Sequence, residues 1–184
     1  MKLYNEDDTL KELRSGDSVI QKKAFEQVVA YYSEKIYWHI RKMVLSHDDA
    51  NDLLQNTFIK AWMNIDFFRG DAKLSTWLYK IAINESITFL NKQRSYNQIS
   101  MDDDDVFLAD KLETDSYFDG DEAQLKLQKA ILTLPEKQRI VFNMRYFEEL
   151  TYDEISEIMG TSVGALKASY HHAAKKIEDF LNRD

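Results

Sequence analysis

Residues 68–84 combine aromatic, cationic and amide side chains at spacings that suit contact with unpaired bases. On a helix that turns about 100° per residue, Trp77, Lys80, Asn84 and Asn91 share a band roughly 60° wide. An indole can stack on a base, an ammonium group can follow phosphates, and an amide can read a Watson–Crick edge. The segment therefore predicts a nucleic-acid-binding ridge. The alternative is an ordinary amphipathic helix whose Trp77 side chain is buried in the protein core.

Two helices must position this ridge. Gly70 interrupts the helical pattern, and a helix is predicted after it over residues 75–93. The helix before it is predicted over residues 48–62, with Asp48 as its N-cap. This earlier helix is apolar on two sides, one formed by Leu53, Leu54, Thr57 and Ala61 and the other by Phe58, Ile59 and Trp62. A docked partner and burial between two neighbouring helices explain the second apolar side equally well.

A second candidate nucleic-acid surface lies near the C-terminus. Thr151 and Glu154 form a capping-box pattern, and Gly160 can end the short helix that follows. Ser162 can then cap a second amphipathic helix. The outward side chains expected on that helix are Lys167, Ala168, His171 and Lys175. This pattern is typical of a DNA-reading helix-turn-helix, with Arg145 on a phosphate. A helical hairpin without DNA contacts is the alternative.

Helical periodicity accounts for the rest of the chain, and no segment alternates with a period of two for long enough to form a strand. Further helices are expected over residues 8–13, 19–44, 121–133 and 134–147, the last with Pro135 at its first helical position. The predicted fold is all-α, with two small helical domains joined by an acidic flexible linker. The expected ranges are 1–96 for the N-terminal helical domain, 97–120 for the linker and 121–184 for the C-terminal helix-turn-helix domain.

The formal net charge of −8 argues at first against a nucleic-acid partner. Residues 99–122, however, hold ten of the 32 acidic residues and one of the 24 basic ones, so the rest of the chain carries +1. The acidity is therefore concentrated in one block, which is expected to be an extended connector. A calcium loop that starts at Asp115 is the alternative, but Tyr117 and Lys126 stand where such a loop needs ligands.

Composition excludes several classes of protein. The 184 residues contain no cysteine, which excludes disulfide frameworks and thiolate metal sites. The sequence has no run of about 18 apolar residues, so no membrane span is expected. The N-terminal residues lack the apolar stretch of a signal peptide. A cytoplasmic protein without membrane insertion is therefore expected.

Adjacent His171 and His172 diverge by about 100° on a helix, so they do not suit one metal ion. Without a recognisable catalytic triad, the chain is predicted to be no enzyme and to need no cofactor.

The order of these motifs resembles a bacterial RNA polymerase sigma factor of the extracytoplasmic-function (ECF) group, over nearly the whole chain. The resemblance rests on residues 48–62 and 68–84 in the first half, and on residues 134–139, 150–155 and 163–167 in the second. It implies a non-catalytic initiation subunit that binds core RNA polymerase and directs it to promoter DNA. The partners implied are the clamp helices of the largest polymerase subunit, a second polymerase contact for the C-terminal domain, and an anti-sigma factor.

The resemblance assigns three sets of residues. The polymerase-binding set is Asp52, Gln55, Asn56, Phe58 and Trp62. The set for the −10 element, read as a single strand, is Phe68, Arg69, Lys73, Trp77, Lys80 and Asn84. The set for the −35 element, read as a duplex, is Arg145, Lys167, Ala168, His171, His172 and Lys175. Asn56 stands where the family commonly has glutamate. Ala168, His171 and His172 also depart from the common pattern, so the −35 sequence cannot be transferred from relatives.

Two other functions are compatible with parts of the sequence. A helix-turn-helix regulator whose N-terminal half senses a ligand or forms a dimer would explain the C-terminal half. It would not explain the ridge around Trp77 or the second apolar side of residues 48–62. A helical adaptor without DNA contacts would leave the basic face of residues 167–171 without a role. Binding to core polymerase separates these classes from a sigma factor.

Overall fold

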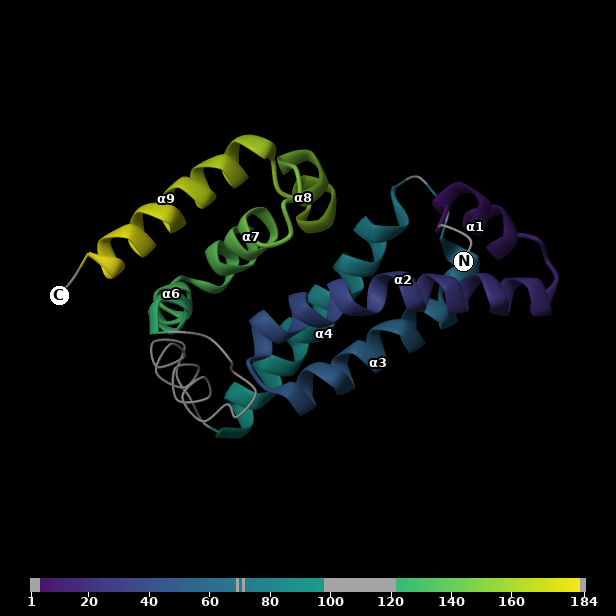
Figure 1. Ribbon diagram of the computed structural model, residues 1–184, viewed down its shortest axis with the longest axis horizontal. Coiled ribbons are helices and arrows are strands. Elements are labelled where there is room, and N and C mark those ends of the chain that lie inside the picture. The colour runs from purple at the N-terminus through teal and green to yellow at the C-terminus, as the bar shows by residue number, and fades with distance from the viewer. Residues whose placement is uncertain (1–3, 69, 71, 98–121, 183–184) are drawn as a thin grey trace.

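The computed structural model describes residues 4–68, 70, 72–97 and 122–182 of the 184-residue chain. Every regular element in these ranges is helical, so the predicted all-α class is confirmed (Figure 1). The first part contains α1 (Glu6–Leu13), α2 (Ser18–Val44), α3 (His47–Met63), the 3-10 helix η1 (Ile65–Phe67) and α4 (Leu74–Asn97). The second part contains α6 (Glu122–Leu132), α7 (Glu136–Tyr146), α8 (Tyr152–Met159) and α9 (Val163–Leu181). Apart from Asn97, the predicted acidic linker lies outside the described residues.

The three long helices α2, α3 and α4 form a bundle, and α1 lies beside the beginning of α2 (Figure 1). Each long helix turns an apolar side inward, which removes that side from water. Fully buried side chains at the centre of the bundle are those of Val28, Ile36, Ile40, Ala61, Leu74, Leu78 and Ala82. The bundle therefore holds α3 and α4, the two helices of the predicted ridge, in fixed register.

The N-cap of α3 differs from the prediction. Ser46, rather than Asp48, caps this helix, and its side-chain oxygen accepts a hydrogen bond from the Asp49 amide at 3.2 Å. Asp48 lies in the first turn instead, where a negative charge favours the helix dipole. Both residue types are good N-caps in isolation, and in the helix that Ser46 opens, Ala50 and Leu53 are both buried.

The second part of the chain encloses a smaller core between α6, α7 and α9. Its buried residues are Ala130, Ile131, Leu134, Phe142, Ala173 and Ile177. Pro135 is the N-cap of α7 and not its first helical residue, so that helix begins one position later than predicted. The loop before α7 thus contributes the buried side chain of Leu134 to the small core.

The caps predicted for α8 and α9 are confirmed. Thr151 Oγ1 accepts a hydrogen bond from the Glu154 amide, and the Glu154 carboxylate accepts one from the Thr151 amide at 2.9 Å. Gly160 ends α8 with a φ of 64°, a left-handed conformation that glycine adopts without a steric penalty. Ser162 then caps α9. These caps set the turn between α8 and α9.

The two described parts share a buried core. α8 packs on α4 and α7 packs on α2. Side chains from α6 to α9 join the same buried cluster as the three-helix bundle, namely Leu132, Ile140, Val141, Met144, Ile155, Ile158 and Leu166. Polar contacts across this junction join His39 to Glu148 at 2.7 Å, Lys73 to Glu154 at 2.7 Å and Arg94 to Glu136 at 3.0 Å. Apolar and polar contacts together therefore hold the parts against each other.

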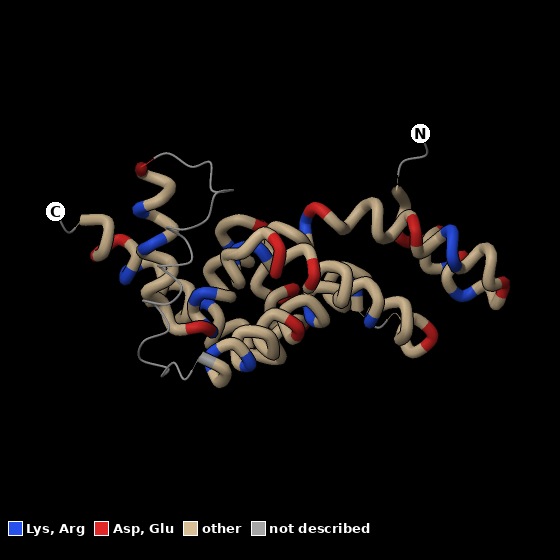
Figure 2. Tube along the Cα trace, turned by 90° about the horizontal axis from the view of Figure 1, so that it is seen from below, with Lys and Arg blue, Asp and Glu red and all other residues tan. Residues whose placement is uncertain are grey.

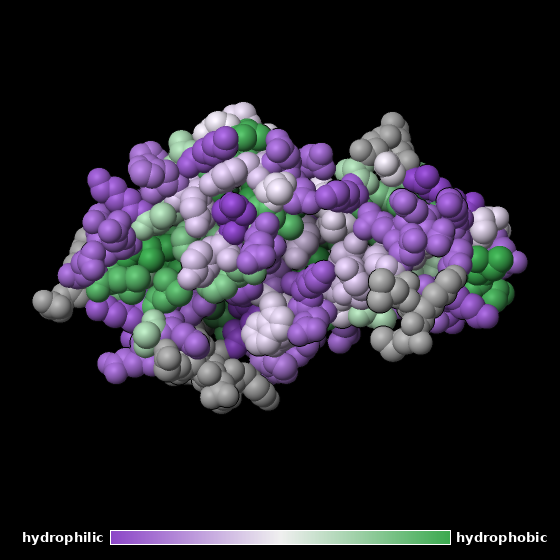
Figure 3. All heavy atoms as spheres, turned by 45° about the horizontal axis from the view of Figure 1, so that its top comes forward, coloured by the Kyte–Doolittle hydropathy of each residue, from purple (hydrophilic) through white to green (hydrophobic). Residues whose placement is uncertain are grey.

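The surface of the described part mixes charges of both signs along its helices (Figure 2). Figure 3 shows a largely hydrophilic face on which hydrophobic side chains gather near the two ends of the molecule. Among the described residues, no helix is long and apolar enough to span a membrane. The same residues bring no three His, Cys, Asp or Glu side chains together as a metal site. Because charges of both signs are mixed along the described helices (Figure 2), attraction of this part of the chain for DNA must come from a few local cations and not from one broad field.

Candidate nucleic-acid interface

The turn between α3 and α4 places one of two adjacent phenylalanines inside and the other outside. In a 3-10 helix, residues three apart lie on the same side. Ile65 and Phe68 therefore both turn inward and are 8% and 9% exposed, whereas Phe67 is 78% exposed. The ring of Phe68 lies 5.0 Å from that of Trp77. Phe68, which was predicted to contact DNA, is thus a packing residue beneath Trp77, and Phe67 presents the exposed ring.

A cavity of about 330 Å³ opens between α3 and α4 beside Phe67. We call it the α3–α4 pocket. It is lined by Lys60, Asn64, Phe67, Trp77, Ile81, Asn84 and Glu85. Lys60 Nζ lies 2.5 Å from Glu85 Oε1, and Asn64 Nδ2 donates to the Lys60 carbonyl at 2.8 Å. Aromatic walls with amides and an ion pair at the rim suit a flat heterocycle that has a polar edge.

The α3–α4 pocket brings together two of the residues predicted for the −10 strand. Trp77 forms part of its wall while half-buried against Phe68, and Asn84 is exposed at its rim. Lys80 is exposed on α4 but does not line the pocket. Arg69 lies outside the described residues. The predicted ridge is therefore a half-buried indole with polar residues beside a hollow.

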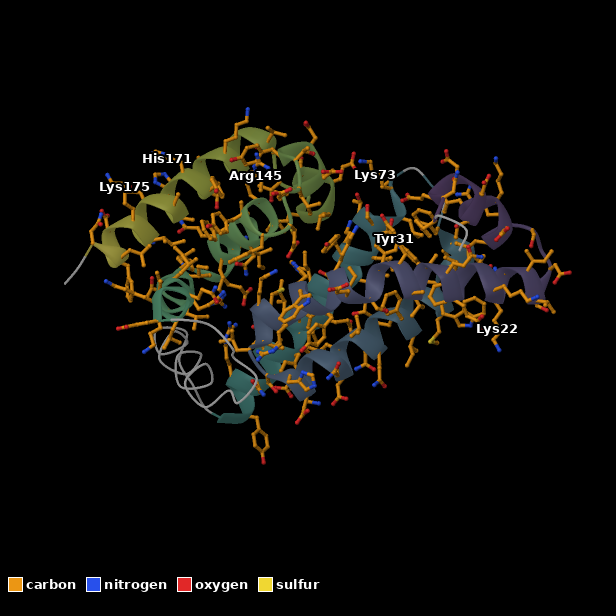
Figure 4. All side chains as sticks on the ribbon, viewed as in Figure 1. Lys22, Tyr31, Lys73, Arg145, His171 and Lys175 are labelled. Carbon is orange, nitrogen blue, oxygen red and sulfur yellow. The ribbon has the colours of Figure 1, made fainter. Side chains whose placement is uncertain are left out.

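Lys73 points toward the second part of the chain. Its ammonium lies 2.7 Å from a carboxylate oxygen of Glu154 on α8 (Figure 4). The hydrogen bond from Lys73, together with those from Thr151, holds the pKa of the Glu154 carboxyl below its usual value. The hydrogen bond to the Glu154 carboxylate in turn raises the pKa of the Lys73 ammonium. In this conformation Lys73 is thus engaged at the junction and stands apart from the α3–α4 pocket.

Lys60, Asn64, Phe67 and Glu85 were missed by reasoning from the sequence. Lys60 and Asn64 belong to the last turn and the C-cap of α3, and they meet α4 only because the two helices pack side by side. For Phe67 a signal was available. Two adjacent aromatic residues in a 3-10 turn point about 120° apart, so one of them can be exposed while the other is buried.

The outer side of α3 carries a continuous exposed stripe. It consists of Asp52, Gln55, Asn56, Ile59 and Met63, which lie within about 100° of arc. Ile59 is 55% and Met63 72% exposed, and Trp62 borders them at 38%. Large exposed apolar side chains with polar neighbours are typical of a protein-binding surface. We call these five residues the α3 stripe.

Phe58, which was assigned to the polymerase-binding set, points into the bundle. Its side chain is 8% exposed, and its ring lies 6.4 Å from that of Phe25 on α2. The next residue, Ile59, is rotated by about 100° and lies outside. The apolar residue at the centre of the stripe is therefore Ile59. Phe58 supports the stripe from the core.

The outward side of α9 carries the residues predicted there. Lys167, Ala168, His171, His172 and Lys175 are all exposed. Figure 4 shows His171 and Lys175 on the side of α9 that faces away from α7. None of these five residues belongs to the core cluster of α6, α7 and α9.

Two predicted cations gather at the first residue of α8. The Arg145 guanidinium and the Lys167 ammonium lie 5.5 and 5.8 Å from the ring centroid of Tyr152, within reach of cation–π attraction. Arg145 also donates to the Leu150 carbonyl at 3.3 Å. Arg145 from α7 and Lys167 from α9 are thereby held near the start of α9.

Residues 28–96 match the family model described as sigma-70 region 2, and residues 124–177 match the one described as sigma-70, region 4. The chain is 31% identical over 180 residues to the ECF RNA polymerase sigma factor SigW of Bacillus subtilis, with 94% of each chain covered. It is 32% identical over 166 residues to the ECF RNA polymerase sigma-E factor of Haemophilus influenzae, with 86% of this chain and 87% of that one covered.

Two solved structures have a similar fold. The sigma factor RpoE, in complex with the anti-sigma factor NepR from Bartonella quintana, gives a TM-score of 0.70 at 24% identity, over 88% of this chain and 99% of that one. CnrH, in complex with the cytosolic domain of CnrY, gives 0.71 at 20% identity, over 97% and 98%. The sequence matches extend over nearly the whole chain, and the fold agrees with them. The chain therefore belongs to the ECF RNA polymerase sigma factors, which are promoter-specific initiation factors that bind core RNA polymerase.

Proposed function

We propose that this sigma factor recognises promoters through three surfaces with separate tasks. The α3 stripe binds core polymerase, the α3–α4 pocket captures an unpaired base of the −10 element, and the outward side of α9 reads the −35 duplex. The α3–α4 pocket is the observation that carries the proposal, because it places the 78% exposed ring of Phe67 and the half-buried ring of Trp77 around a hollow with a polar rim. In this proposal, residues 1–96 and 121–184 are the two promoter-recognition domains, and residues 97–120 are the linker between them.

Capture of a base requires that the protein compensate for the loss of stacking in the duplex. Phe67 and Trp77 offer aromatic surfaces, and stacking on such a surface contributes about 1–3 kcal/mol per base. Asn64 and Asn84 at the rim can hydrogen-bond to the edge of the base. Lys80, exposed four residues before Asn84, suits a phosphate of the same strand. These contacts support strand separation at the −10 element.

The arrangement of α9 supports reading of a duplex. Its early turns present Lys167, Ala168 and His171, and side chains at these positions of a recognition helix meet base edges in the major groove. Arg145 and Lys175 suit phosphates. With so few cations, the isolated chain should bind promoter DNA weakly and lose that binding steeply with salt. Attachment of both units to polymerase would raise the effective concentration of each at its element.

The partners follow from these surfaces. The α3 stripe, with apolar side chains inside a polar rim, suits a helical partner such as the clamp helices of the largest polymerase subunit. The C-terminal unit would make a second polymerase contact. Such a non-catalytic subunit would work in the cytoplasm. Because RpoE is described in complex with the anti-sigma factor NepR, we extend an anti-sigma partner to this chain as part of the proposal.

Truncation of the α3 stripe tests the proposed polymerase contact. Ile59→Ala combined with Met63→Ala is expected to raise the Kd for core polymerase about tenfold or more, since the loss corresponds to at least about 1.4 kcal/mol. Competition against labelled wild-type protein measures this Kd. Tyr96→Ala is the matched control, because Tyr96 is 89% exposed near the end of α4 and lies outside the stripe. Equal affinities of the double variant and the control would contradict the assignment.

A further inference from the structure

Glu6 of α1 links the beginning of α4 to the bundle. One of its carboxylate oxygens accepts a hydrogen bond from the Leu74 amide at 2.9 Å, and the other accepts one from the Tyr32 hydroxyl at 2.9 Å. Leu74 is the first residue of α4, where backbone amides lack partners within the helix and a negative charge is favoured. Tyr32 is 4% exposed and gives the carboxylate a fixed anchor on α2. Figure 1 shows α1 beside the beginning of α4.

Gln21, in the first turn of α2, makes a second link from the same region. Its side-chain amide donates to the Leu13 carbonyl at the end of α1 at 3.1 Å and to the Asp66 carboxylate on η1 at 3.0 Å. Arg14, the C-cap of α1, donates to the Phe68 carbonyl at 3.4 Å. Both ends of the chain segment that joins α3 to α4 are therefore attached to α1 or to its junction with α2.

These links end next to the two aromatic walls of the α3–α4 pocket. Asp66 directly precedes Phe67, and Leu74 lies less than one helical turn before Trp77. Leu74 is fully buried, so a shift of the first turn of α4 would move Trp77 with it. Neither Glu6 nor Gln21 lines the pocket. Their influence on a bound base can pass only through the walls.

We propose that α1 and its junction with α2 position the α3–α4 pocket, with Glu6 fixing the first turn of α4 and Gln21 fixing η1, so that Trp77 and Phe67 are held in place in the pocket wall before a base enters. The inference rests on the proposed capture of a base in this pocket. Aromatic side chains that are already held in place lower the entropy that must be lost when the base enters. Glu6 and Gln21 are positioning residues in this scheme, since they touch no DNA.

Opening of a promoter by holoenzyme tests the role of Glu6. The promoter carries 2-aminopurine in the −10 element, whose fluorescence reports unstacking. We expect Glu6→Ala to lower the opened fraction about fivefold. Glu6→Gln should recover most of the opening, because its amide oxygen can still accept from the Leu74 amide. Asp7→Ala, at an exposed position in the same turn of α1, should open the promoter like the wild type.

The affinity for core polymerase should stay unchanged in all three variants, which separates positioning from assembly. Opening by Glu6→Ala equal to that of Asp7→Ala overturns the inference. A loss of polymerase affinity that accounts for the whole loss of opening overturns it as well. If Glu6→Ala does not fold, Gln21→Ala breaks the other link and is judged by the same two measurements.

A double-mutant cycle separates this inference from base capture itself. If Glu6 acts through the pocket, Glu6→Ala should have a smaller effect on opening in a Phe67→Ala background than in the wild type, because only Trp77 then remains to be positioned. Additive losses would overturn the positioning role and leave base capture intact. Wild-type opening by Phe67→Ala alone would instead refute capture, and the positioning role would fall with it. The two failures are therefore distinguishable.

Discussion

Phe67→Ala is expected to reduce promoter opening by the holoenzyme about 5- to 150-fold, the equivalent of the roughly 1–3 kcal/mol that one aromatic–base stack contributes. Phe67 is 78% exposed, so its ring gives almost nothing to the stability of the folded chain. The loss should therefore fall on the open complex alone. Permanganate reactivity of unpaired thymines in the −10 element measures the open complex directly, and binding to core polymerase serves as the check on assembly.

Asn84→Ala extends this prediction to the polar rim. Loss of a hydrogen bond to the edge of the base should lower opening and also flatten the preference for one base at the captured position, by about 1–3 kcal/mol. Asn91→Ala is the matched control, because Asn91 is exposed on the same side of α4 two turns later and does not line the α3–α4 pocket. If both asparagine variants open promoters like the wild type, the rim does not read the base.

Phe58→Ala is expected to destabilise the folded chain by about 3–5 kcal/mol, the usual range for removal of a buried phenylalanine. The side chain is 8% exposed and packs against Phe25, so its removal leaves a cavity between α2 and α3. A loss of this size is a large part of the stability of an ordinary domain. Urea unfolding followed by circular dichroism measures it.

Ile59→Ala is the control for Phe58→Ala, since the two residues are neighbours on one helix. Ile59 is 55% exposed, and its truncation should change the free energy of unfolding by no more than about 0.5 kcal/mol. The affinity for core polymerase should fall more in Ile59→Ala than in Phe58→Ala, provided that each protein is measured under conditions in which it is fully folded. Similar losses of stability in the two variants would show that α3 is rotated relative to the arrangement described above.

The helices of this protein could be predicted well because their signals are local. Thr151, Glu154, Gly160 and Ser162 each act within one turn, and the structure confirms the caps that they predict. The long apolar face of α2 was equally clear from its spacing. Even where the first helical residue was wrong, as at Asp48 and Pro135, the error was one or two positions.

The inward side of α3 could not be predicted with the same certainty. This helix is apolar on two sides, and a rotation of about 100° exchanges Phe58 for Ile59. Which of them is buried depends on Phe25, which lies 33 positions earlier and meets α3 only in the folded bundle. The sequence alone therefore found the helix and most of its exposed stripe but misplaced one aromatic residue.

The α3–α4 pocket was half visible in the sequence. Trp77 and Asn84 were found because they lie on one helix at helical spacing. Lys60 and Glu85 come from different helices and are joined by an ion pair that no local pattern announces. The same holds for the contact of Glu6 with Leu74, which spans 68 positions. Long-range contacts of this kind depend on how whole helices pack, and so they appear only in the structure.

Selection of promoters from a randomised DNA library by run-off transcription tests the central assignment most directly. Holoenzyme with the wild-type chain should enrich two separated sequence blocks. Asn84→Ala should relax the downstream block alone, and Lys167→Ala combined with His171→Ala should relax the upstream block alone. Relaxation of the same block by both variants, or of neither block, would contradict the division of promoter reading between the α3–α4 pocket and α9.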